Sequence, residues 1–99
     1  MAQAFEWDER KRARNLAKHG VDFVRATLIF DGPTVTRVDT RVPYGEERIQ
    51  VIGMAGGTFL TVVITLRQGA IRIISARKAS RREQATYRAV RPEEAQGQD

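Results

Sequence analysis

Basic side chains dominate the second half of this 99-residue chain. Between Arg67 and Arg91 there are eight basic residues and one acidic residue, Glu83. An arginine side chain presents a planar fork that matches phosphate oxygens, and backbone N–H groups at the start of a helix add to that attraction. We expect six basic residues to converge where the last strand ends and the last helix begins: Arg48, Arg72, Arg77, Lys78, Arg81 and Arg82.

These residues predict a phosphate-binding site, and the alternative is a solvated basic surface that keeps the domain soluble. We favour phosphate binding for the three arginines that strands position, Arg48, Arg72 and Arg77. For Arg81 and Arg82 the two interpretations stay open.

A few ionisable residues could move protons. His19 is the single histidine, and imidazole is a common general base, but His19 falls in the last turn of a predicted helix, where a cation complements the helix dipole. Glu83 stands three residues after Ser80, as in a capping box, which accounts for it without catalysis. Tyr87 either packs in the core or reaches a bound base. Three further carboxylates could orient arginines or accept a proton: Asp39, Glu46 and Glu47.

Composition limits the possible functions. The net charge of +5 and the pI near 10.4 favour nucleic acid, an acidic protein or an anionic membrane surface as partner. The absence of cysteine excludes disulfides and thiolate metal sites, and one histidine excludes multi-histidine zinc sites, so we expect no metal and no cofactor. We see no membrane span and no signal peptide, and we expect a cytoplasmic protein.

Two helices are predicted at the N-terminus. Asp8 is a suitable N-cap for a helix that runs to about Lys18 and ends at Gly20, and Asp22 caps a second, short helix. The first helix has a thin apolar stripe of Ala13, Leu16 and Ala17, and the second has an apolar face of Phe23, Ala26, Thr27 and Phe30.

After Pro33 the hydrophobic period changes from 3.6 to 2, which predicts strands at 34–39, 48–54, 58–66 and 70–77. The first is polar and suits a sheet edge, and residues 40–47 form a loop. Gly56-Gly57 and Gln68-Gly69 predict tight hairpin turns, and a helix follows from Ser80 to about Val90. The expected fold is therefore α+β: two N-terminal helices, an antiparallel sheet of about four strands and a C-terminal helix. We expect residues 1–90 to form one domain and residues 91–99 a disordered tail.

Two-residue turns fix the expected register. On the face that the helices cover, we expect the rows Ile49–Ile64–Ile73 and Val51–Val62–Ser75. On the opposite face we expect the rows Arg48–Thr65–Arg72, Gln50–Val63–Ile74 and Ile52–Thr61–Ala76. Arg77 then lies on the helix-covered face, apart from the other two arginines. Glu46 or Glu47 could neutralise the row of arginines instead of a bound anion.

Three segments resemble one known family: WDERKRARNLAKHGVDF at 7–23, EERIQVIG at 46–53 and RIISARKASRREQATY at 72–87. They are similar to the BrnT family, small toxins of bacterial type II toxin–antitoxin systems with a fold like that of the RelE ribonucleases. The resemblance spans residues 5–88. It implies a ribonuclease that arrests translation and is neutralised by a BrnA-like antitoxin with a ribbon-helix-helix domain. It also implies a heterotetramer containing a toxin dimer, which contacts promoter DNA only through the antitoxin.

The resemblance further implies metal-independent RNA cleavage, which needs a base, an acid and cations around the phosphate. On this hypothesis Arg48, Arg72 and Arg77 bind the scissile phosphate. Protons are handled by Lys18, His19 or Glu47. Tyr87 supports the site or stacks on a base, and Lys78, Arg81 and Arg82 hold the RNA. The alternatives are a basic module that binds RNA or DNA without cutting it, and a module that only docks an antitoxin.

Overall fold

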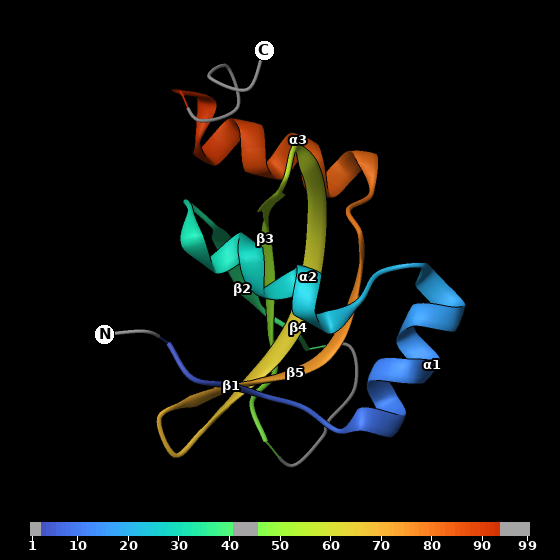
Figure 1. Ribbon diagram of the computed structural model, residues 1–99. Helices are drawn as coiled ribbons and strands as arrows, with labels where there is room; N and C mark the ends of the chain where they lie inside the picture. Colours follow the sequence, from blue (N-terminus) through green and yellow to red (C-terminus); the bar gives the residue numbers. More distant parts are fainter. Residues whose placement is uncertain (1–2, 41–45, 94–99) are drawn as a thin grey trace.

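The computed structural model describes residues 3–40 and 46–93, and these fold around one five-stranded sheet (Figure 1). The strands are β1 (Phe5–Glu6), β2 (Val35–Val38), β3 (Ile49–Ala55), β4 (Thr58–Arg67) and β5 (Ala70–Lys78). The helices are α1 (Glu9–His19), α2 (Phe23–Ala26), the 3₁₀ helix η1 (Thr27–Asp31) and α3 (Arg81–Val90). The α+β prediction is confirmed.

The sheet has the strand order β1-β5-β4-β3-β2, with β2 at an edge as predicted. Strand β1 pairs parallel to β5, whereas the other pairs are antiparallel. We had not predicted β1, because two residues are too few to show a strand's alternation. Both predicted turns are confirmed, with positive φ at Gly56 and Gly57 and at Gln68 and Gly69, as both central residues of a type I′ turn require.

A β-bulge in β5 changes the predicted register. Ile64 pairs with Ile73 as expected, but Val63 pairs with Ser75, so Ile74 is an extra residue between them. Beyond the bulge Ala76 faces Val62. Three predicted rows are therefore wrong from this point on: Val62–Ser75, Val63–Ile74 and Thr61–Ala76.

The bulge also moves Arg77. It pairs with Thr61, whose neighbour on β3 is Ile52, so Arg77 lies on the same face of the sheet as Arg72. The expectation that Arg77 faces the helix-covered core is wrong for this reason.

The main core lies between the sheet and the segment α2–η1. Its buried residues from that segment are Phe23, Ala26 and Ile29, at a spacing of three. We had predicted Thr27 and Phe30 in place of Ile29, and both are half-buried. The 3₁₀ turn explains the difference, because three residues per turn align positions i and i+3. Trp7 packs edge-on against Phe23, at 6.1 Å between ring centroids, and covers this core.

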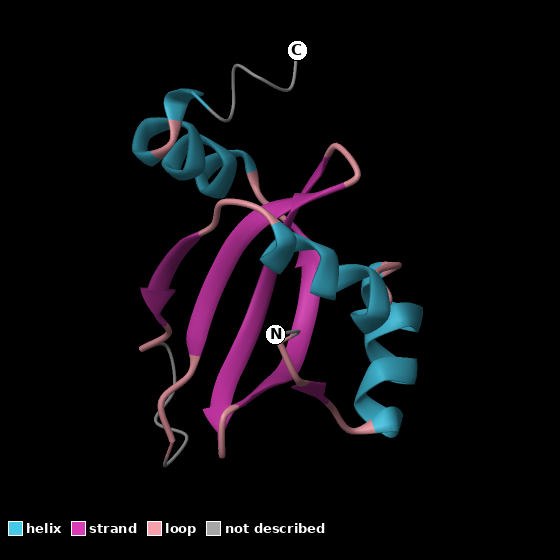
Figure 2. Ribbon diagram, turned by 60° about the vertical axis from the view of Figure 1, so that its left-hand side comes forward, coloured by secondary structure: helices cyan, strands magenta, loops and turns pink. Residues whose placement is uncertain are grey.

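Helix α3 packs against the face of the sheet opposite the main core, and Figure 2 shows it at the upper end of the sheet. Tyr87 packs there against Ile52 and Phe59. Just past α3, Arg91 donates from Nε to the carbonyl of Thr34 at 2.8 Å. Residues 94–99 of the predicted tail and residues 41–45 of the predicted loop lie outside the described residues. In the part of the chain that is described, no helix is long and apolar enough to cross a membrane.

Helix α1 turns its apolar stripe outward and a polar residue inward, the reverse of the predicted packing. Ala13, Leu16 and Ala17 are all exposed, and the buried residue of α1 is the polar Asn15. The reason is the position of α1 beside β5 at the flank of the sheet, rather than over the core (Figure 1). Its inward contact is therefore made by hydrogen bonds, while its caps, Asp8 and Gly20, are as predicted.

Gly53 allows η1 to lie close to β3. A Cβ at this position would come within 2.9 Å of the Cβ of Ile29. We therefore expect Gly53→Ala to lower the free energy of unfolding by about 1–3 kcal/mol, because the packed segment must shift. Chemical denaturation measures this change. Gly32→Ala is the control, since a Cβ there meets nothing within 4 Å. Equal effects of the two substitutions would contradict the close approach.

Candidate functional site

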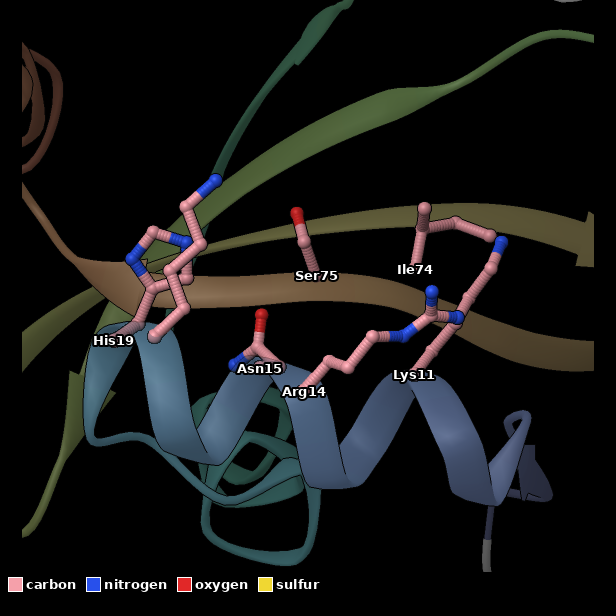
Figure 3. Close-up of a pocket in the computed structure, with 7 residues that line it drawn as sticks. Lys11, Arg14, Asn15, His19, Ile74 and Ser75 are labelled. Atoms are coloured by element: carbon pink, nitrogen blue, oxygen red, sulfur yellow. The ribbon is translucent and has the colours of Figure 1, made fainter.

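An open cleft of about 370 Å³ lies between α1 and β5 (Figure 3). Two predicted proton-handling residues, Lys18 and His19, line it. The complete lining is Lys11, Arg14, Asn15, Lys18, His19, Ile74 and Ser75. Residues three and four apart share a helix face, so the five lining residues of α1 form one continuous edge that faces β5. The cleft therefore gathers cationic groups above a strand that contributes a hydroxyl.

The Asn15 amide holds α1 against this strand. Its Nδ2 donates to the carbonyl of Ala76 at 2.7 Å and to that of Val21 at 2.9 Å, and its Oδ1 accepts from the N–H of Ala76 at 3.1 Å. This amide thus bonds both backbone groups of Ala76, as a neighbouring strand would. Lys18 and His19 follow on the next turn, so the position of the cleft depends on Asn15.

The bulge supplies the other wall. Ile74 is the inserted residue and Ser75 follows it, and both line the cleft. Figure 3 shows the side chains of Arg14 and His19 extending from α1 on the side of the helix that faces Ser75. Lys11, Arg14 and Ser75 were missing from the predicted site. The spacing of Lys11, Arg14 and Lys18 could have indicated them, had the polar face of α1 been taken as the inner one.

A second group of side chains centres on Glu83, at the start of α3. Arg77 donates to both of its carboxylate oxygens, at 2.7 and 2.8 Å, and Arg37 donates to Oε2 at 3.3 Å. The predicted capping box is confirmed, with the N–H of Ser80 on Oε1 at 2.8 Å and the Ser80 hydroxyl accepting from the N–H of Glu83 at 3.1 Å. We expected the capping box alone to account for Glu83. It does not, because two arginines also donate to the same carboxylate.

The other two arginines that we expected on strands, Arg48 and Arg72, have carboxylate partners. Arg72 donates to Glu6 at 3.0 Å, and Arg48 lies 4.0 Å from Glu46. The alternative that Glu46 neutralises part of the arginine row is thus supported for Arg48. Arg72 uses a residue of β1 instead, which could not be foreseen because β1 was not predicted.

Four other predicted residues lie outside the cleft. Glu47 is exposed at the start of β3, where it lines a separate hollow of about 220 Å³ with Thr65 and Leu66. Lys78, Arg81 and Arg82 are exposed at the end of β5 and in the first turn of α3. None of the three lines the cleft, and Lys78 pairs with Leu60 of the main core, so it lies on the face of the sheet opposite Arg77.

Tyr87 belongs to the core. Its exposed fraction is 1%, its ring lies edge-on to Phe59, and its hydroxyl donates to the carbonyl of Pro33 at 3.2 Å. A ring buried in this way cannot stack on a base, so the structure contradicts that half of the expectation. Tyr87 anchors α3, which carries Glu83.

Asn15→Asp tests how α1 is held. The carboxylate cannot donate to the carbonyls of Val21 and Ala76, and it is buried, so we expect a loss of roughly 1–3 kcal/mol in the free energy of unfolding. Hydrogen exchange at the amides of α1 should rise more than exchange at β3 and β4. Leu16→Asn on the exposed side of α1 is the control. Unchanged exchange in Asn15→Asp would show that other contacts hold α1.

Glu83 predicts an acid-sensitive component of stability. The hydrogen bonds from Arg77, with that from the Ser80 N–H, outweigh burial and lower the pKa of Glu83 from 4.5 to about 2. The ionised form therefore stabilises the folded state above about pH 4.5, and this contribution is lost as the pH falls towards 2. We expect the difference in free energy of unfolding between the wild type and Glu83→Gln to shrink across that window. Urea titrations at several pH values measure it, and a difference independent of pH would refute the assignment.

A protein-family model described as "Ribonuclease toxin, BrnT, of type II toxin-antitoxin system" matches residues 7–83. The match begins just before α1 and ends at Glu83, so it contains both walls of the cleft and the contact between Arg77 and Glu83. A comparison with curated proteins found no match.

Proposed function

This chain belongs to the BrnT family of ribonuclease toxins of type II toxin–antitoxin systems, and on that premise we propose that it cleaves RNA in the cleft between α1 and β5 without a metal ion. The observation that carries the proposal is the convergence of Lys18 and His19 with Lys11 and Arg14 above Ser75. A cleft with this lining attracts phosphodiester groups, and it also supplies groups that can exchange protons.

The proposed reaction is an internal transesterification. His19 in its neutral form takes the proton of the ribose 2′-hydroxyl, and the 2′-oxygen attacks the adjacent phosphorus. The bond from phosphorus to the 5′-oxygen breaks, and the Lys18 ammonium gives a proton to that leaving oxygen. The products are a 2′,3′-cyclic phosphate and a 5′-hydroxyl end.

Cations stabilise the extra negative charge that the phosphate carries in the transition state. Lys11 and Arg14 line the cleft and can do this directly. Arg72 and Arg77 lie on the face of the sheet opposite α2. We therefore propose that they, together with Arg48, bind the part of the RNA strand that lies next to the cleft. Lys78, Arg81 and Arg82 add long-range attraction. Glu47 has no proton-transfer role in this scheme, since it does not line the cleft.

The family implies a cognate antitoxin. We propose that it is a BrnA-like protein with a ribbon-helix-helix DNA-binding domain, and that two toxins bind it in a heterotetramer in the cytoplasm. Promoter DNA would then be contacted through the antitoxin. The net charge of +5 supports an acidic toxin-binding segment in that partner.

Substitutions in the cleft test the proposal. Inducing the wild-type chain should arrest growth and produce new RNA ends, and co-expression of the neighbouring gene should relieve the arrest. We expect Lys18→Ala and His19→Ala each to lower the cleavage rate by about 10²–10⁴-fold, because each removes a proton-transfer group. Arg67→Ala is the charge-matched control, since Arg67 is exposed at the β4–β5 turn. Full toxicity of both cleft variants would refute this site.

One face of the sheet carries Arg37, Arg72 and Arg77, and we call it the arginine-rich face. It favours a second candidate function, in which the chain binds RNA without cutting it. Growth would then be arrested without new RNA ends, and RNA affinity would fall steeply with salt concentration. Mapping RNA ends in the same cultures separates the two functions.

A further inference from the structure

Arg37 was not among the predicted site residues, yet it meets Arg77 at Glu83. Arg37 lies on β2 and Arg77 on β5, so their side chains approach each other across β3 and β4. A second hydrogen bond also fixes the Arg37 side chain, since its Nε donates to Oε1 of Gln50 at 2.7 Å. Two guanidinium groups from distant strands are thus fixed at one point of the sheet face.

At this point the carboxylate of Glu83 is shared by two guanidinium groups, those of Arg37 and Arg77. The Glu83 side chain is 5% exposed, whereas those of Arg37 and Arg77 are 48% and 32% exposed. The negative charge is therefore covered, and the positive charge faces solvent. A phosphate of a bound strand would meet the guanidinium groups first.

A row of residues connects this point to the cleft. Arg37 pairs with Gln50, Gln50 with Val63, and Val63 with Ser75, which lines the cleft. Three strand spacings separate the ends of this row, a distance of about 14 Å. An RNA strand that enters the cleft and crosses the sheet at right angles to its strands would reach Arg37.

We infer that Arg37 and Arg77 form a second phosphate-binding site for the RNA strand whose cleavage we propose in the cleft, and that Glu83 is the positioning residue of this site. The inference rests on the proposed function, and it extends the RNA contact to the edge strand β2. Glu83 does not touch RNA. It holds the two guanidinium groups in the orientation that a phosphate requires.

The test uses binding of a single-stranded RNA whose riboses are all 2′-O-methylated, so that it cannot be cleaved through the 2′-oxygen. We expect Arg37→Ala to weaken binding about tenfold and to reduce the slope of log affinity against log salt by about one phosphate contact. Arg37→Lys should keep the slope but recover only part of the affinity, because it lacks the fork. Arg67→Ala, which removes the same charge elsewhere, should leave both unchanged.

Glu83→Gln distinguishes positioning from simple charge. The substitution removes a negative charge, so it should strengthen RNA binding if Glu83 only opposes the arginines. A positioning residue predicts the opposite sign, a loss of affinity of several-fold. Far-ultraviolet circular dichroism confirms that each variant is folded.

The outcomes are separable. If the wild type binds the methylated RNA and Arg37→Ala has the same slope as Arg67→Ala, the second site is refuted and the cluster is a structural ion pair, while cleavage in the cleft stands. Tighter binding by Glu83→Gln would refute its positioning role. If the wild type does not bind RNA at all, both the proposed function and this inference fail.

Discussion

The hydrogen bonds between the Asn15 amide and the backbone of Ala76 hold α1 against β5 and so form the cleft in which we propose that RNA is cleaved. Because α1 lies beside the sheet rather than over it, little apolar surface holds it, and the amide substitutes for the backbone of a neighbouring strand. Removing it would leave buried backbone groups of β5 without these partners, which is costly. The same contact brings the turn with Lys18 and His19 against the strand.

The bulge at Ile74 is the second constraint, and it acts on the same strand. One inserted residue places Ser75 in the cleft and turns Ala76 towards the core, where its backbone meets Asn15. It also places the Arg77 side chain on the other face of the sheet, where it reaches Glu83. A regular β5 would separate Arg77 from Arg72, so the arginine-rich face depends on an irregularity of one residue.

Local sequence patterns predicted much of the fold. The caps at Asp8 and Ser80, the paired turn residues and the change of period at Pro33 each reflect short-range chemistry, and all were confirmed. The errors involve longer-range effects. The bulge is a feature of how β5 pairs with β4, and the two-residue strand β1 depends on its partner β5. The apolar stripe of α1 suggested an inward face, but the tertiary position of the helix beside the sheet turned that stripe outward. Of the predicted site, Lys18 and His19 share a cleft, whereas Glu47 lies elsewhere and Tyr87 is buried.

The central claim is that the groups of the α1–β5 cleft cleave RNA through its own 2′-oxygen. The most direct measurement is to incubate the purified chain with a defined single-stranded RNA in the presence of EDTA and to identify both new ends. The account predicts fragments with 2′,3′-cyclic phosphate and 5′-hydroxyl ends, formed at the same rate with and without the chelator. Fragments that form only when Mg²⁺ is added and that carry 5′-phosphate ends would contradict it, as would intact RNA.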